Sequence, residues 1–195
     1  MSKATETGKR KDYELKITLL ESDPPIWRLV RVPADIRLSH LHRVIQIAMG
    51  WEDDHLHQFV IKGASYMDFG RPGPDIDTQD EDATRLSEVV TRVNTKLRYW
   101  YDFGDDWWHE IQLKRMIRIP PDEKIALVCV DGAGACPPED CGGVWGYYTK
   151  LDILEDPEHP DHPYVAEWMG EDFDPDAFDR EAVNQRLERL ARHIR

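Results

Sequence analysis

The chain has 195 residues and a net charge of -13, from 38 acidic side chains against 25 lysines and arginines. Because phosphate attraction depends on clustered Lys and Arg, this overall charge does not support direct nucleic-acid binding, although a local basic patch could still provide it. A hydrophobic share of 41% is typical of a globular protein with a real core, and argues against a disordered chain.

Three further features indicate the compartment. No apolar stretch is long enough to cross a membrane, and the first residues lack the apolar segment of a secretory signal. The cysteines are odd in number and lie close together, which argues against a disulfide framework. The sequence therefore predicts a cytoplasmic protein without membrane contact.

The N-terminal third predicts a flexible leader, a hairpin and a helix. Residues 1–11 are small and polar, and a single α+β domain is expected over 12–195. Strand composition indicates Tyr13–Leu20 and Ile26–Pro33, which "SDPP" joins as an antiparallel hairpin. Helical spacing follows, with Ser39 as the predicted N-cap and Gly50 as the stop.

The central third predicts a strand, an exposed loop and a second hairpin. Residues 55–63 have strand character, and the acidic segment 71–83, rich in Pro and Gly, is expected to be an exposed loop. The hairpin pairs Lys96–Phe103 with Trp107–Ile117. Alternation along its first strand places one set of side chains on a common face: Leu97, Tyr99, Tyr101 and Phe103.

The remainder predicts one buried strand, 125–130, and then helices from about residue 147. The last helix is expected over 174–194, with Asp174 as N-cap and Pro175 in the first turn. Strands followed by helices indicate an α+β fold. We expect an antiparallel sheet of two hairpins plus further strands, packed with one helix of the N-terminal half and a C-terminal helical segment.

The loop "DGAGACPPEDCGGVWGY", residues 131–147, admits several interpretations. Cys129, Cys136 and Cys141 could hold a structural zinc ion, but their spacing does not form a CxxC knuckle, and buried cysteines are often small apolar fillers. A phosphate cradle would need the Lys-Ser/Thr pair that is missing here. The favoured interpretation is a rigid turn, with Gly142 and Gly143 at positive φ, that closes over the sheet near His55 and His109.

A second group of residues could provide metal chemistry. His55 and His57 would share one strand face, and His109 with Asp105 could complete a divalent-metal site, such as zinc, with an open position. Glu139 or Asp140 would then be the general base of a hydrolase. The alternative, which we favour, is that these imidazoles brace neighbouring strands and that no cofactor is required.

The aromatic residues of the second hairpin and the last helix are the remaining candidates. Trp108, His109 and Tyr101 could form a binding surface, but the carboxylates around the hairpin turn favour packing over stacking of bases. The arginines of the last helix are interpreted mainly as a solvated face, with contact to a protein partner or DNA as the alternative. They are Arg180, Arg186, Arg189, Arg192 and Arg195.

Six sequence motifs follow one another along the chain: "PPIWRLVRVP", "LHRVIQIAMGW", "HLHQF", "YDFGDDWWHEI", "PPEDCGGVWGY" and "FDPDAFDREAVNQRL". Together they resemble the plasmid pRiA4b ORF-3-like family over Tyr13 to Leu190. The resemblance implies an association with plasmids and transposable elements, and some members are labelled transposon passenger or resolvase-like proteins. No nucleophile in an arginine-rich setting supports the resolvase label here.

We therefore expect a non-catalytic binding or accessory module of mobile genetic elements, acting with a protein partner or a nucleic-acid-associated complex. The first alternative is a metal-dependent hydrolase with a His/carboxylate site, its catalytic residue among Glu139, Asp140 and Asp105. The second is a DNA-binding protein that acts through its C-terminal helix.

Overall fold

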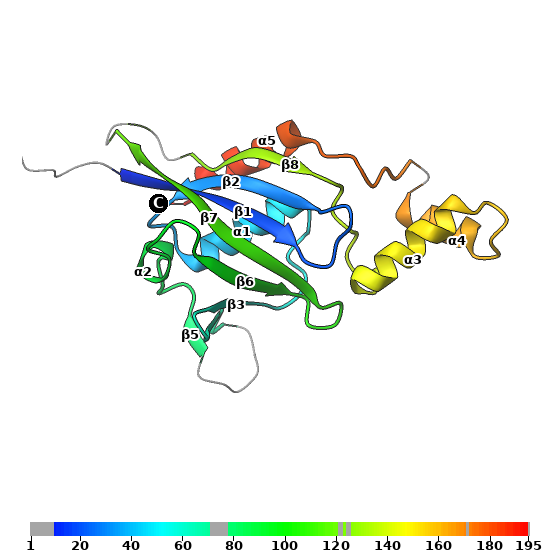
Figure 1. The fold of residues 1–195 in the computed structure, drawn as a ribbon, viewed down its shortest axis with the longest axis horizontal. Coiled ribbons are helices and arrows are strands. Elements are labelled where there is room, and N and C mark those ends of the chain that lie inside the picture. Colours follow the sequence, from blue (N-terminus) through cyan, green and yellow to red (C-terminus); the bar gives the residue numbers. More distant parts are fainter. Residues whose placement is uncertain (1–9, 71–77, 121–122, 124–125, 171, 195) are drawn as a thin grey trace, which may run out of the picture.

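The computed structural model describes residues 10–70, 78–120, 123, 126–170 and 172–194. They form an α+β fold, an eight-stranded and mostly antiparallel sheet with five helices, in the strand order β5-β4-β3-β6-β7-β1-β2-β8 (Figure 1). The strands are β1 Arg10–Leu19, β2 Trp27–Pro33, β3 His57–Ile61, β4 Ala64–Met67, β5 Thr78–Asp80, β6 Lys96–Tyr101, β7 Trp107–Ile119 and β8 Val128–Ala133. The helices are α1 Leu38–Met49, α2 Leu86–Val89, α3 Gly143–Glu155, α4 His162–Met169 and α5 Arg180–Ala191.

Both expected hairpins are present. β1 pairs antiparallel with β2, β6 pairs antiparallel with β7, and β1 also pairs with β7, which joins the two hairpins into one sheet. β4 and β5 extend the sheet beyond β3, and the β4–β5 pair is parallel. The sheet is therefore larger than the two hairpins and the two other strands that the sequence predicts.

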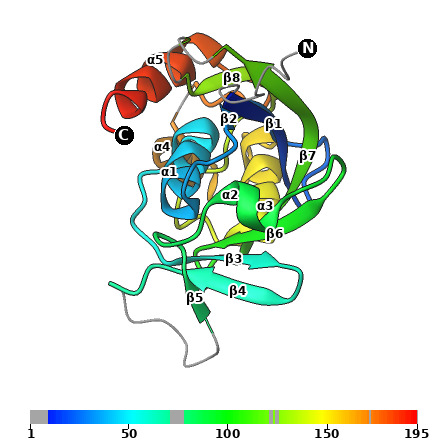
Figure 2. The same cartoon turned by 90° about the vertical axis from the view of Figure 1, so that its left-hand side faces the viewer.

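One face of the sheet carries the core. Side chains alternate along the central strands, so that Leu15 and Ile17 of β1 meet Leu113 and Ile111 of β7 in a fully buried layer. Helix α1 packs its apolar stripe on this layer; its buried side chains include Leu41, Val44, Ile45 and Ala48. Figure 1 views the opposite face, with α1 behind the strands, and Figure 2 shows α1 and α5 on one side of the long strand β7.

The buried Arg28 ties the end of α1 to the end of β8. Its guanidinium donates to the backbone oxygens of Ala48, Ala133 and Gly134 at 2.8–2.9 Å, while its face packs on the Phe178 ring at 4.0 Å. A buried charge is tolerated when its donors are satisfied in this way. The bonds fix the point at which the loop between β8 and α3 starts.

The C-terminal helices occupy two places. α3 and α4 lie together beyond one end of the sheet, whereas α5 returns to pack against β8 and α1 (Figure 1). Asn184 of α5 bonds the outer edge of β8, accepting from the Cys129 amide at 2.7 Å and donating to the Cys129 carbonyl at 3.0 Å. Arg180 adds a bond to the Val130 carbonyl at 2.9 Å.

The predicted boundaries need correction at both ends. Of the predicted leader, residues 1–9 lie outside the described residues, but Arg10 and Lys11 belong to β1, because β7 continues to Ile119 and pairs with them. The helical part begins at Gly143 rather than near 147, directly after Gly142, which has a left-handed φ of 89°.

Two predicted helix caps are wrong. α1 begins after Arg37, and the Ser39 hydroxyl donates instead to Asp82 at 2.7 Å. α5 begins after Asp179, whose carboxylate accepts from the Ala182 amide at 2.9 Å. The predicted N-cap Asp174 lies before α5, where it bonds the Asp176 amide.

Two further predictions fail because of local turns. In the segment expected to be an exposed loop, 71–77 lies outside the described residues, but Thr78–Asp80 forms β5 and Glu81 is buried. Phe103 does not share the face of Tyr101, because Asp102 has a left-handed φ of 52°. The Phe103 ring instead contacts the Trp100 ring in a tilted arrangement, at 4.2 Å between centroids. In the described part of the chain, no helix has the length and apolar character of a membrane span.

Candidate functional site

Three sequence motifs converge on the His55 side chain. His55 precedes β3, Asp102 follows β6, and Glu139 with Asp140 lies in the loop between β8 and α3. The His55 Nε2 atom is 3.7 Å from Asp102 Oδ2, 3.7 Å from Glu139 Oε2 and 3.3 Å from Asp140 Oδ1. The "PPED" loop thus closes over His55, as the sequence predicts, and its carboxylates face the imidazole.

Backbone geometry positions the two aspartates. Asp102 and Asp140 have φ values of 52° and 58°, which non-glycine residues seldom adopt. Asp102 is also held by two hydrogen bonds, because its amide donates to the Leu56 carbonyl at 2.9 Å and its Oδ1 accepts from the Gly104 amide at 2.9 Å. Strained backbone of this kind is concentrated at functional sites.

Glu139 is fixed through its other oxygen. Oε1 accepts from the Tyr101 hydroxyl at 2.8 Å and from the Glu52 amide at 2.9 Å, which leaves Oε2 directed toward His55. Burial, followed by the nearby Glu139 carboxylate, raises the pKa of Tyr101 above its ordinary value, so this hydroxyl remains a donor. The loop is tied to the core at Trp51, whose indole N–H donates to the Pro137 carbonyl at 3.0 Å.

This His55 cluster, defined as His55, Asp102, Glu139 and Asp140, has the donor set of a divalent-cation site. Candidate ligand atoms of His55, Asp102 and Asp140 all lie within 4.8 Å of one another. One imidazole with carboxylates suits Mn²⁺, Fe²⁺ or Zn²⁺. The side chains range from 10% exposed at Asp102 to 76% at Asp140, so an ion could enter from solvent and keep an open coordination position.

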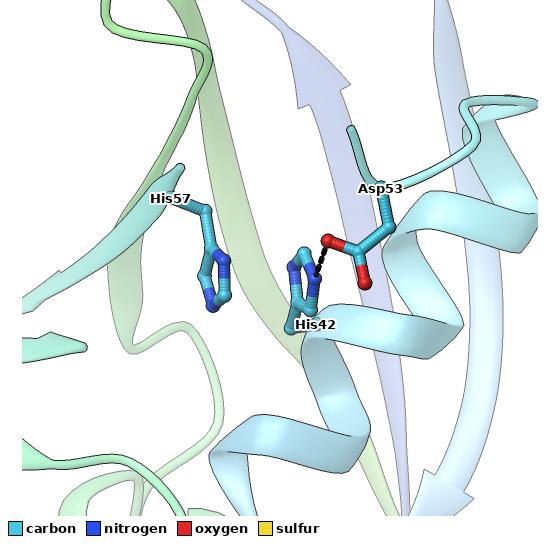
Figure 3. Close-up of side chains that lie close together, drawn as sticks. All are labelled: His42, Asp53 and His57. Carbon is cyan, nitrogen blue, oxygen red and sulfur yellow. Dashed lines mark hydrogen bonds and ion pairs between the residues drawn. The ribbon is translucent and has the colours of Figure 1, made fainter. Parts of the chain in front are cut away.

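A second group, His42, Asp53 and His57, lies in the core beside β3 (Figure 3). The rings of His42 and His57 stack at 3.5 Å between centroids and 2° between planes. A metal ion binds an imidazole nitrogen along its in-plane lone pair, at about 2.0–2.1 Å for zinc. Lone pairs in two parallel planes do not converge, so this group cannot hold one ion through both rings without rotating one of them.

Protein hydrogen bonds satisfy three of the four ring nitrogens of the stacked pair. The Gln46 amide donates to the Tyr99 hydroxyl at 2.9 Å, and that hydroxyl lies 2.8 Å from His42 Nδ1. If the Tyr99 hydroxyl donates to His42 Nδ1, the neutral His42 ring carries its proton on Nε2. This N–H then donates to the Asp53 carboxylate at 2.9 Å, so both ring nitrogens of His42 are bonded. His57 Nε2 pairs with buried Glu81 at 2.8 Å, while its Nδ1 has no partner among the described residues.

The three histidines proposed as a joint ligand set are not brought together. His55 faces the carboxylate cluster, His57 stacks on His42, and His109 is enclosed by Trp51 and Tyr99 at 5.2 and 5.5 Å between ring centroids. His55 and His57 do not share a strand face, because β3 begins only at His57. Burial lowers the pKa of His109 from 6.5 to about 3, so this ring is neutral.

The three cysteines also fail to form a ligand group within the described residues. Burial raises the pKa of each thiol above its ordinary value, which disfavours the thiolate that metals bind. Cys129 lies on β8, and Cys141 directly precedes the two glycines that start α3. Gly142 and Gly143 have the predicted positive φ, at 89° and 69°.

The other candidate residues take different places. Asp105 accepts from the Gly142 amide at 3.0 Å and so anchors the start of α3. Trp108 pairs with Trp100 on the open face of the sheet, at 4.8 Å between centroids. Tyr101 and His109 point to the buried face, so Trp108, His109 and Tyr101 do not form one binding surface.

Sequence reasoning missed two buried polar residues, His42 and Glu81. His42 occupies a position on the inner face of α1, where an imidazole among apolar side chains is a signal of a buried hydrogen-bond partner. Glu81 had no such signal, because its neighbours are acidic and polar.

Comparisons with known proteins are consistent with one another. Residues 11–182 match the family described as "Plasmid pRiA4b ORF-3-like protein". The chain is similar to "Uncharacterized protein y4hQ" of Sinorhizobium fredii (strain NBRC 101917 / NGR234), with 38% identity over 91% of each chain. It is also similar to the crystal structure of "Protein of Unknown Function MM3350" from Methanosarcina mazei Go1, with 34% identity, a TM-score of 0.79, and coverage of 88% of this chain and 97% of the other. The chain therefore belongs to the plasmid pRiA4b ORF-3-like family.

Proposed function

We propose that the protein is a cytoplasmic binding module that takes up a divalent cation at the His55 cluster. The observation that carries the proposal is the convergence of three carboxylates from two separate segments on one imidazole nitrogen, at 3.3–3.7 Å. Even with a protonated ring, ionised carboxylates would leave the cluster with a surplus of negative charge. A bound cation would offset their mutual repulsion.

The metal site that the sequence offered only as an alternative is thereby taken up with different ligands. His55 remains a candidate ligand, but Asp102 and Asp140 replace His57 and His109, which lie elsewhere in the core. The plasmid in the family's name supports an accessory role on mobile genetic elements, with a protein or nucleic-acid complex as partner. This role, like the cation, is part of the proposal.

The direct test is calorimetric titration of chelator-treated full-length protein with Mn²⁺, Zn²⁺ and Mg²⁺. We expect one site with a preference for Mn²⁺ or Zn²⁺ over Mg²⁺, because the set includes a nitrogen donor. Asp102→Asn and His55→Ala should each weaken binding by tenfold or more. Asp106→Asn is the matched control, since this neighbouring aspartate also has a left-handed φ, of 61°, but bonds Trp108 outside the cluster.

The outcome that contradicts the proposal is equally specific. Binding that is absent in the wild-type protein, or unchanged in both cluster variants, would show that the carboxylates serve only to shape the loop. Far-ultraviolet circular dichroism of each variant would establish that a loss of binding is not a loss of folding.

A metal-dependent hydrolase is the second candidate, favoured by the geometry of Glu139. Because its Oε1 is fixed by two donors, its Oε2 is held toward His55, where it could accept a proton from a water molecule. Metal-dependent hydrolysis of bis(p-nitrophenyl) phosphate that Glu139→Gln abolishes would support this candidate. Unchanged turnover in Glu139→Gln, or none in the wild type, would exclude the role for that substrate class.

A further inference from the structure

A basic groove lies between α1 and α5 and shares no lining residue with the His55 cluster. Its volume is about 300 Å³, at the lower end of the range for small-molecule sites. Its lining residues are Arg43, Ile47, Arg186, Arg189, Leu190 and His193. We use "basic groove" for this set of residues.

Helical spacing on both elements creates the groove. Arg43 and Ile47 are four residues apart on α1, whereas Arg186, Arg189 and His193 recur at three- and four-residue intervals along α5 and its end. Residues at these intervals lie on one helix face. Because α5 packs against α1, the two faces border the same groove.

The charge of the groove is opposite to that of the whole chain. Three arginines and one histidine line it without a carboxylate, although the chain contains 38 acidic residues and has a net charge of -13. Arg186 has Glu52 nearby, at 3.6 Å. Within the described part of the chain, the guanidinium groups of Arg43 and Arg189 form no ion pair. Cationic side chains that lie together, most of them without an acidic partner, favour an anionic ligand.

We propose that the basic groove binds a compact phosphorylated small molecule. Guanidinium groups match phosphate oxygens through paired N–H donors, and Ile47 with Leu190 offers an apolar surface for the rest of the ligand. Carboxylates nearby restrict its size, because Glu52 and Glu188 are 72% and 71% exposed. Glu52 pairs with Arg186 of α5, and Glu188 pairs with Arg192 just after that helix. They would repel the further phosphates of an extended nucleic-acid strand.

The experiment titrates full-length protein with inorganic phosphate, adenosine monophosphate and a 20-nucleotide single strand at low salt. We expect saturable binding of the two small ligands, with adenosine monophosphate binding more tightly than inorganic phosphate. The single strand should bind no more tightly than adenosine monophosphate. Arg43→Gln and Arg189→Gln should each weaken binding roughly tenfold or more. Arg192→Gln is the matched control, because Arg192 lies one turn from Glu188 on the same helix end but does not line the groove.

Three results would overturn the proposal: no binding of either small ligand, equal affinity in Arg43→Gln and wild type, or an equal loss in Arg192→Gln. Tighter binding of the strand, with an affinity that falls steeply with salt, would assign the groove to nucleic acid instead. His55→Ala should leave phosphate binding unchanged, so the test is independent of the proposed cation site.

Discussion

Replacing His109 with methionine should flatten the dependence of stability on pH. The His109 ring is fully buried, and neither nitrogen makes a hydrogen bond of good geometry with the described residues. Burial disfavours the charged ring and lowers its pKa from 6.5 to about 3, an effect that the nearby backbone of Tyr99 and Trp107 only partly opposes. Methionine fills a similar volume, adapts to irregular space and does not titrate.

The sign follows from proton binding. Between the folded pKa and the unfolded value of 6.5, only the unfolded chain is protonated at His109, so stability is fully present above 6.5 and is lost as the pH falls. At pH 4.5, about two units below the unfolded pKa, the loss from this one group is about 2.7 kcal/mol. His109→Met removes that contribution.

Urea unfolding followed by tryptophan fluorescence at pH 7.5, 6.0 and 4.5 measures the effect. The free energy of unfolding of His109→Met, relative to wild type, should rise by about 2–3 kcal/mol between the highest and the lowest pH. Leu113→Met, at a fully buried position that does not titrate, should keep the wild-type slope. Parallel curves for His109→Met and wild type would refute the reasoning, because they would mean that the folded protein accepts this proton.

Two further predictions concern backbone geometry and a buried pair. Gly143→Ala should lower the free energy of unfolding by more than ~1–2 kcal/mol, because φ is 69° and the new Cβ would meet the Asp105 carbonyl. Gly63→Ala, with φ at 83° but no neighbouring atom within 4 Å, should lower the free energy of unfolding only through its unfavourable φ. Equal losses for the two variants in urea unfolding would contradict the contact argument. Glu81→Ala should cost about 1–3 kcal/mol, because it removes the acceptor of the buried His57 Nε2–H, whereas Glu81→Gln, which keeps a side-chain oxygen, should cost less. Indistinguishable melting temperatures for Glu81→Ala and wild type would show that the pair contributes nothing.

The sheet was predictable where side-chain alternation is strong. Leu97, Tyr99 and Tyr101 are buried in register with β7, as their spacing predicts. The short strands β4 and β5 were not predicted, because four and three residues are too few to display a period. The N-cap prediction at Ser39 failed because of a tertiary contact: the Ser39 hydroxyl donates to Asp82, which lies in a distant segment.

The candidate site was predictable in its parts and not in its assembly. The sequence singles out His55, Glu139 and Asp140, and it predicts that the loop carrying Glu139 and Asp140 closes over the sheet. It does not indicate that His109 is excluded, because the pairing of β7 with β6 and β1 places this ring on the buried face of the sheet. Glu81 shows the same limit, since its burial depends on His57 and not on its own neighbours.

The two bonds from Asn184 to Cys129, with the one from Arg180, also protect the protein from association. β8 ends the sheet, so its outer amides and carbonyls would otherwise offer a template to a strand from another molecule. Helix α5 occupies that edge with side chains rather than with a ninth strand. Detachment of α5 would therefore expose a strand-addition surface while the rest of the sheet stayed folded, and conditions that loosen this helix should favour aggregation before global unfolding.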